Sequence, residues 1–148
     1  MIRYSEKAQR AKNFVDFRRD FQSASPLPMD RGPMPYALNI DTATVENENF
    51  RTVLWTGAHL QTTLMSISAG GEIPVENHEG SDQMLYIVRG EGEVIIEGEM
   101  MTVRSGYAVF IPAGKTHRVK NTSGRELKLF SVYAPPIHRR GSVDKDAI

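Results

Sequence analysis

The chain has 148 residues, of which 18 are basic, 18 are acidic and none is cysteine. This length predicts one domain with its own core, and the balanced charge argues against a protein that binds nucleic acid or an anionic membrane. The lack of cysteine excludes disulfides, thiolate catalysis and cysteine-bound metal sites. The N-terminal region has no apolar stretch that fits a signal peptide or a membrane span, so we expect a cytoplasmic protein.

The first 35 residues differ from the rest of the sequence. Residues 5–22 show a helical pattern, with Ser5 as a possible cap and apolar residues at helical spacing. These apolar residues are Ala8, Ala11, Phe14 or Val15, Phe17 and Phe21. Residues 23–35 contain four prolines, which is typical of a linker or an extended arm. We expect a helix and a Pro-rich arm at 1–35, with the apolar face packed on the domain or on a partner subunit.

From residue 36 onward, short extended runs alternate with turn residues, which predicts an all-β sandwich or barrel. The expected strands are 36–40, 50–56, 60–68, 74–78, 83–89, 94–97, 100–104, 107–111, 117–119 and 127–133. The expected turns are 47–49, 57–59, 70–71, 98–99 and 121–124. The run Ala134-Pro135-Pro136 should end the sheet, and residues 137–148 should form a polar surface tail. By alternation, four aromatic side chains are expected in the interior: Trp55, Tyr86, Phe110 and Tyr133.

Two stretches, 70–90 and 106–121, hold the residues that suggest a functional site. In an extended strand, residues two apart point to the same face, so Glu76 and His78 would project together. Gln83 begins the next extended run, and His117 begins another. Two imidazoles and one or two oxygen groups that converge from separate strands make a plausible divalent-metal site.

The second stretch resembles the second motif of the cupin superfamily at every position. It reads Gly106, five residues, Pro112, one residue, Gly114, two residues, His117, three residues and Asn121. This spacing is specific, and it makes the chain similar to cupins over residues 35–136. Several strand sequences also resemble a subgroup of small single-domain bacterial cupins that are often labelled mannose-6-phosphate isomerase-like.

The first stretch resembles the first cupin motif in spacing and departs from it at two residues. That motif is glycine, five residues, His-x-His, three or four residues, glutamate, six residues and glycine. This chain begins with Gly70, has Glu76 in place of the first histidine, and keeps His78 as the second. Gln83 stands in place of the glutamate, and Gly90 closes the motif.

The resemblance implies a fold and an assembly. Cupins share the all-β double-stranded β-helix, or jelly-roll barrel, which we expect at 36–136, after the helix and arm and before the tail. Cupins commonly pair subunits through sheet edges, and the N-terminal helix could cover such an edge. We therefore expect a homodimer.

The resemblance also implies roles for individual residues. His78 and His117 are expected to be metal ligands, whereas Gln83 is either a ligand, as in some cupins, or a buried amide bonded to backbone. Glu76 is a third ligand, a general base or a rim residue that faces solvent. In a second alignment, His78 is the first histidine of the motif, Gly80 replaces the second, and Glu76 falls outside the site.

Four other polar residues near these motifs are expected to have simpler roles. We expect His59 in a hairpin turn, and His138 after two prolines, to be surface histidines. Asp82 should be a turn residue or a hydrogen-bond partner of a ligand, and Glu79 should be a surface charge.

The implied function is a divalent metal ion (Mn, Fe, Ni, Co or Zn) held by the four candidate ligands. The ion would bind a small molecule with two oxygens, such as a hydroxy acid, a keto acid or a sugar derivative, and polarise it. Such a site suits isomerase or lyase chemistry, with Glu76 moving a proton, or dioxygen chemistry at a redox-active metal. The alternatives are a small-ligand-binding module without catalysis and a structural cupin with a degenerate site.

Overall fold

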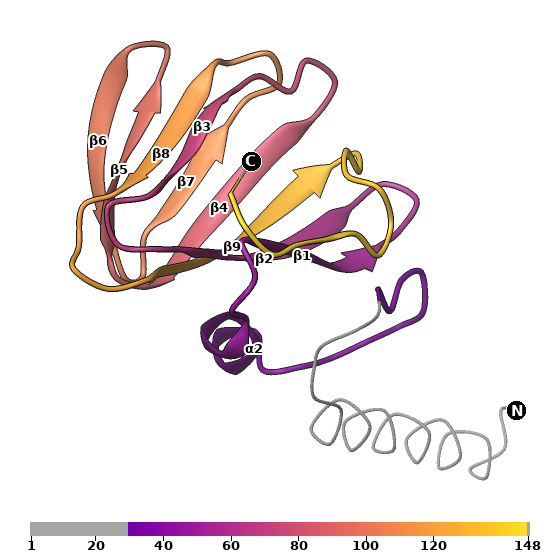
Figure 1. Cartoon of the computed structure of the whole chain (residues 1–148). Helices are drawn as coiled ribbons and strands as arrows, with labels where there is room; N and C mark the ends of the chain where they lie inside the picture. Colours follow the sequence, from indigo (N-terminus) through magenta and orange to yellow (C-terminus); the bar gives the residue numbers. More distant parts are fainter. Residues whose placement is uncertain (1–29, 148) are drawn as a thin grey trace, which may run out of the picture.

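Two antiparallel sheets face each other in the computed structural model, which describes residues 30–147 (Figure 1). The strands are β1 (Arg51–Thr56), β2 (Gln61–Ile67), β3 (Glu72–Glu76), β4 (Asp82–Arg89), β5 (Glu91–Ile96), β6 (Glu99–Arg104), β7 (Ala108–Ile111), β8 (His117–Asn121), β9 (Leu127–Ala134) and β10 (Val143–Asp144). One sheet has the order β10-β1-β2-β9-β4-β7, and the other has the order β3-β8-β5-β6. The predicted all-β double-sheet fold is confirmed. The helix predicted at 5–22 lies outside the described residues.

The strand predicted at 36–40 is wrong, because the chain there is irregular and then forms the helix α2 (Ile40–Glu46). Asn39 caps this helix, since its side-chain oxygen accepts a hydrogen bond from the backbone nitrogen of Thr42 at 3.0 Å. Asp41 in the first turn adds favourable charge. The alternating apolar residues of this stretch suggested a strand, but the cap determines the local structure.

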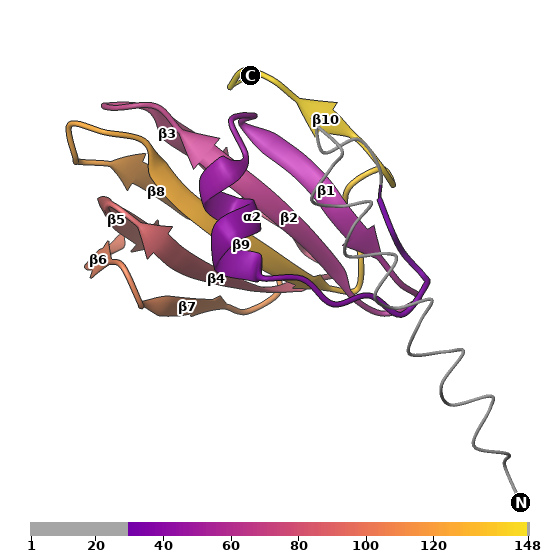
Figure 2. The same cartoon turned by 90° about the horizontal axis from the view of Figure 1, so that it is seen from below.

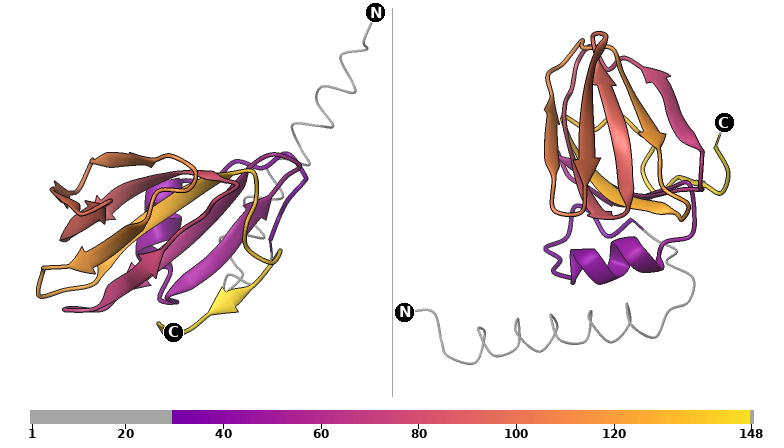
Figure 3. Two further views of the ribbon diagram at one scale, coloured as in Figure 1. Left: turned by 90° about the horizontal axis from the view of Figure 1, so that it is seen from above. Right: turned by 90° about the vertical axis from the view of Figure 1, so that its left-hand side faces the viewer.

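Helix α2 lies on the outer face of the six-stranded sheet, outside the barrel (Figures 2 and 3). Its Ala43 packs with Leu54 and Leu64 in a small apolar cluster, against which Phe130 also packs. None of the helices in the described part of the chain is long and apolar enough to cross a membrane.

The predicted surface tail contributes a strand. Arg51 of β1 pairs with Asp144 of β10, and Thr52 pairs with Val143, so the described part of 137–148 extends the edge of the larger sheet. The division of the chain into arm, barrel and tail stays a prediction. The hairpin turn between β5 and β6 falls at 97–98, one residue before its predicted place.

The interior prediction is confirmed for Tyr133, which is buried, and is wrong for the other three aromatic residues. Phe110 is 74% exposed, because its neighbours Val109 and Ile111 are the buried residues of β7 and alternation along a strand then directs Phe110 outward. Trp55 and Tyr86 are half-buried on the outer face of the larger sheet.

The barrel interior is polar at one end and apolar at the other. On the inner face of the larger sheet, one row of cross-strand neighbours is polar and consists of Gln61, Tyr133 and Gln83. The next inward row is mixed, because Thr63 pairs with Ser131. Four strand positions from Gln61 the row becomes apolar, and Met65 pairs with Leu129. The apolar rows belong to a large buried core cluster that both sheets supply. The polar row therefore marks one end of the barrel as the place for a site.

A buried amide joins the loops at the apolar end. Asn121 donates from Nδ2 to the carbonyl oxygens of Ile67 at 2.9 Å, Ser68 at 3.0 Å and Arg125 at 2.7 Å. We predict that Asn121→Ala lowers the free energy of unfolding by about 2–4 kcal/mol, because the substitution leaves buried carbonyls without partners. Urea unfolding measures this loss. Asn77→Ala, at an exposed asparagine, serves as control, and equal losses in the two variants would contradict the assignment.

Candidate metal centre

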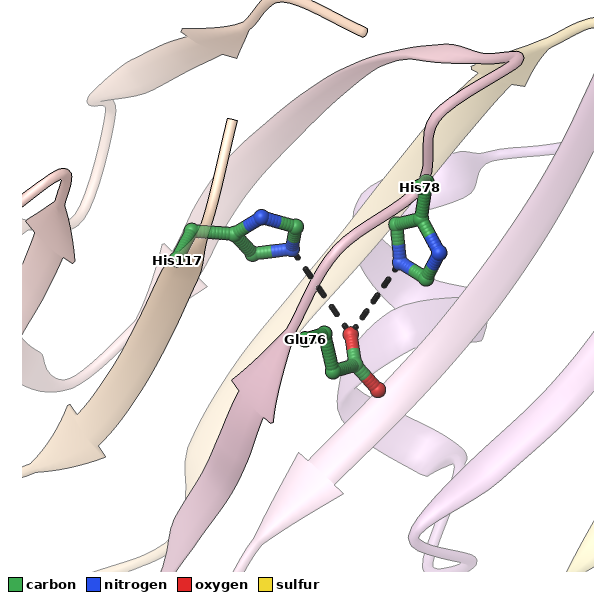
Figure 4. Close-up of side chains that lie close together, drawn as sticks. All are labelled: Glu76, His78 and His117. Carbon is green, nitrogen blue, oxygen red and sulfur yellow. Dashed lines mark hydrogen bonds and ion pairs between the residues drawn. The ribbon is translucent and has the colours of Figure 1, made fainter. Parts of the chain in front are cut away.

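Three predicted site residues meet at the polar end of the barrel. Glu76 at the end of β3 and His117 at the start of β8 are cross-strand partners, and His78 follows Glu76 by two residues. One ligand atom from each of the three lies within 4.8 Å of the others (Figure 4). This grouping agrees with the first alignment of the motif, while Gly80 lies exposed in a turn.

The two oxygens of Glu76 face different groups. Oε2 lies 3.2 Å from His78 Nε2 and 3.7 Å from His117 Nε2 (Figure 4). Oε1 lies 3.4 Å from a terminal nitrogen of Arg51, whose other terminal nitrogen lies 3.2 Å from Asp144 Oδ2. Arg51 thus holds one side of the carboxylate and leaves the other side to the histidines.

A backbone hydrogen bond orients His117. Its Nδ1 lies 2.9 Å from the carbonyl oxygen of Lys115, which can only accept, so Nδ1 carries the proton. Nε2 is buried and has no hydrogen-bond partner among the described residues. Metal-binding histidines commonly show this arrangement, with one ring nitrogen fixed by a carbonyl and the other left for the ion.

The environment shifts the pKa values of Glu76 and His117 in opposite directions. Burial alone would raise the pKa of Glu76, but the nearby imidazoles of His117 and His78 and the charge of Arg51 outweigh it and lower this pKa to about 2. Burial alone would lower the pKa of His117, but the Glu76 carboxylate and the bond to Lys115 raise it. Glu76 is therefore a carboxylate near pH 7, and it attracts a proton or a cation to His117.

Gln83 lies at the same end of the barrel but outside the group of three. Its Nε2 donates to Ser131 Oγ at 3.1 Å and to the Tyr133 hydroxyl at 3.3 Å. The ring centroid of Tyr133 lies 5.7 Å from that of His78. The amide is thus bonded to side chains, whereas the simpler prediction had it bonded to backbone. Its Oε1 is buried without a partner in the described range.

The prediction of a surface position for His138 is wrong. Its ring centroid lies 5.0 Å from that of Tyr133 and 6.5 Å from that of His78, and its Nε2 is buried. Burial and the charge of Arg51 lower the pKa of His138 to about 4, so the ring is neutral near pH 7.

Gln61 explains why His138 lies there. Its Oε1 accepts hydrogen bonds from the backbone nitrogens of Ile137 at 3.1 Å and His138 at 2.9 Å, and its Nε2 donates to the His138 carbonyl at 2.9 Å. Gln61 is fully buried. A polar residue at an inward strand position was the one signal in the sequence that could have indicated this contact.

Several buried polar atoms at this end lack hydrogen-bond partners within the described part of the chain. They are Arg51 Nε, Gln83 Oε1, His117 Nε2 and His138 Nε2. Each such atom costs about 1–3 kcal/mol when nothing pairs with it, and a cluster of them indicates a place for a polar ligand, an ion or water.

The remaining predicted residues lie away from the three ligand candidates. His59 and Glu79 are exposed, as predicted. Asp82 is also exposed and is the first residue of β4 rather than a turn residue. It accepts a hydrogen bond from the backbone nitrogen of Ala113 at 2.9 Å, so it joins this strand to the turn at 113–114.

Comparisons with known proteins match the part of the chain that carries the site. A family model described as "Cupin domain" matches residues 63–133. The protein YrkC of Bacillus subtilis is 42% identical over 135 residues, which are 87% of this chain and 73% of YrkC. The crystal structure of BH2720 from Bacillus halodurans is similar with 45% identity and a TM-score of 0.78, over 79% of this chain and 93% of that chain. A Thermotoga maritima protein named oxalate-binding protein is 28% identical over 68 residues, which are 46% of this chain and 56% of that protein.

The low pKa of Glu76 leads to a prediction for the metal-free protein. A pKa lowered from 4.5 to about 2 stabilises the fold above pH 4.5, and this stabilisation is lost as the pH falls toward 2. Glu76→Gln should therefore lower the free energy of unfolding by up to about 3 kcal/mol above pH 5, and by progressively less below pH 4.5. Urea unfolding across this range measures it. Glu79→Gln is the control, and a loss that does not change with pH would refute the prediction.

Proposed function

Because this chain belongs to the cupin superfamily, we propose that it binds a divalent metal ion through Glu76, His78 and His117 and uses it to hold a small oxygen-bearing metabolite. The observation that carries this proposal is the convergence of three ligand atoms within 4.8 Å. One of them, the buried Nε2 of His117, has no hydrogen-bond partner among residues 30–147. Two imidazoles and a carboxylate suit Mn, Fe, Ni, Co or Zn and leave positions open for a ligand. A bound ion would act as a Lewis acid on an oxygen of the metabolite.

The role of Glu76 follows from its protonation state. A general base works best when its pKa lies near the operating pH, and the pKa of Glu76 is about 2. This value favours a ligand role over the role of a proton shuttle. The rings of Tyr133 and His138, whose centroids lie 5.7 Å and 6.5 Å from that of His78, are the candidates for contact with the metabolite.

Charge favours an anionic metabolite. Near the site, one cation (Arg51) and two carboxylates (Glu76 and Asp144) lie in contact, and His138 is neutral. A divalent ion would change the net charge of this buried group from minus one to plus one, and a carboxylate-bearing ligand would offset the excess. Oxalate is a suitable first probe, because the chain resembles a protein named for binding it.

A binding cupin without catalysis is the second candidate function. It is favoured by Gln83, because a neutral amide stands where cupins have a glutamate ligand, and its nitrogen is already bonded to Ser131 and Tyr133. If the protein is an enzyme, isomerase or lyase chemistry and dioxygenase chemistry both fit the ligand set. The mannose-6-phosphate isomerase-like subgroup and the homodimer stay predictions.

The proposal predicts stoichiometric metal in untagged protein. Elemental analysis and calorimetric titration with Mn, Fe, Ni, Co and Zn should give one ion per chain. His78→Ala and His117→Ala should each weaken binding by about 100-fold or more, because even residues that only orient a ligand affect affinity by about 10–100-fold. Oxalate should bind the metal-loaded parent and not the metal-free protein.

The matched control is His59→Ala, which removes an exposed histidine and should bind metal like the parent. If His78→Ala and His117→Ala both keep the metal content of the parent, the ion binds elsewhere. No metal after reconstitution would reject the metal site and leave a metal-free small-ligand-binding module and a structural cupin as the remaining explanations. Metal binding without oxalate binding would reject this ligand and keep the metal site.

Gln83 can be tested as a fourth ligand. A carboxylate binds these ions more strongly than an amide oxygen, so Gln83→Glu should raise metal affinity by about 10-fold if Oε1 faces the ion. Gln83→Leu should lower it. Calorimetry on the two variants measures the difference, and equal affinities in parent and variants would remove Gln83 from the ligand set.

A further inference from the structure

An apolar row crosses the outer face of the larger sheet next to α2. Successive cross-strand neighbours in this row are Trp55, Thr62, Val132, Met84 and Phe110, which come from β1, β2, β9, β4 and β7. We call these five residues the outer row. Helix α2 contacts β2, β9 and β4 and packs on the adjacent row, which includes Leu64 and Phe130.

The outer row is open at both of its ends. Phe110 is 74% exposed, Leu60 beside Trp55 is 41% exposed, and the middle of the row is half-buried. A groove of about 510 Å³ lies at the β1 end and is lined by Leu38, Leu54 and Trp55 among others. A second groove of about 440 Å³ lies at the β7 end. Single exposed apolar residues are ordinary, but a row across five strands in which every side chain except Thr62 is apolar indicates a surface that another element covers.

The dimensions of the row suit a helix. Strands lie about 4.8 Å apart, so the four steps of the row span about 19 Å. The apolar pattern predicted for the N-terminal helix runs from Ala8 to Phe21, and 14 residues of helix are about 20 Å long. Within it, Phe14, Phe17 and Phe21 recur at helical spacing and form one apolar stripe.

The start of the described chain lies at one end of the row. Asp30 Oδ1 accepts a hydrogen bond from the backbone nitrogen of Thr56 at 2.8 Å, next to Trp55. The indole nitrogen of Trp55 donates to the Met34 carbonyl at 2.8 Å, which fixes the arm against β1. The seven residues 23–29 can span up to about 24 Å, enough to bring a helix at 5–22 back over the row.

We infer that residues 5–22 dock as a helix on the outer row of their own chain, beside α2, with the three phenylalanines against the sheet. This contact would support β4 and β9 from outside the barrel, where Gln83 and Tyr133 are the inward neighbours of Met84 and Val132 along the two strands. The inference does not depend on the proposed metal.

Trp55 reports directly on this contact, because it is the one tryptophan of the chain. The test is a triple phenylalanine variant of the 148-residue chain, with Phe14→Ser, Phe17→Ser and Phe21→Ser together. Because this variant should uncover Trp55, its emission should shift to longer wavelength and its quenching by acrylamide should increase. The matched control is Gln9→Ser, Lys12→Ser and Asp16→Ser, which leaves the net charge unchanged, alters the opposite helix face and should leave the emission as in the parent.

A single substitution in the row gives an independent readout. Phe110 is too exposed to be needed for folding. It lies four strand-to-strand steps from Trp55, which is a distance of about 19 Å. Phe110→Ser should still shift the emission, since one helix covers both residues. Equal emission in the parent, the triple phenylalanine variant and the Phe110 variant would overturn the inference, as would an equal shift in the control.

Light scattering separates docking on the same chain from docking on a second copy. The triple phenylalanine variant should have the same mass as the parent. A fall from two chains to one in that variant would show that the segment docks on another subunit, which would overturn the intrachain arrangement.

Discussion

Three parts of the chain that are distant in the sequence meet at the carboxylate of Glu76. One of its oxygens faces His78, which follows β3, and His117 of β8, and the other faces Arg51 of β1, which also binds Asp144 of the C-terminal strand. Buried charges are costly unless they are paired, so these residues hold one another in place. The same contact leaves His117 Nε2 without a hydrogen-bond partner in the part of the chain that the structure describes.

The division of the barrel interior explains how the fold tolerates such a site. The apolar rows around Met65 and Leu129 supply the burial that stabilises the barrel. The polar row at the other end of the barrel, Gln61, Tyr133 and Gln83, costs stability where a buried atom such as Gln83 Oε1 has no partner among the described residues. Functional sites commonly carry a local cost of this kind, which the rest of the fold offsets.

Much of the barrel was predictable, because alternation along a strand is a local pattern. The spacing of the second motif also identified His117, and the first motif identified Glu76 and His78. The sequence did not indicate the roles of Arg51, Gln61 and His138, because their contacts join residues that are far apart in the chain. Arg51 contacts Glu76, and Gln61 contacts His138. The strand predicted at 36–40 failed for a different reason, because the cap at Asn39 outweighed the apolar alternation.

We propose that two histidines and Glu76 bind one ion. X-ray absorption spectroscopy of protein loaded with one equivalent of zinc counts the imidazoles around the metal. The account predicts two imidazoles with oxygen ligands in the parent, and one imidazole in His117→Ala if that variant is loaded at high zinc concentration. An ion with no imidazole would contradict the site, and three imidazoles would show that another histidine, such as His138, belongs to the ligand set.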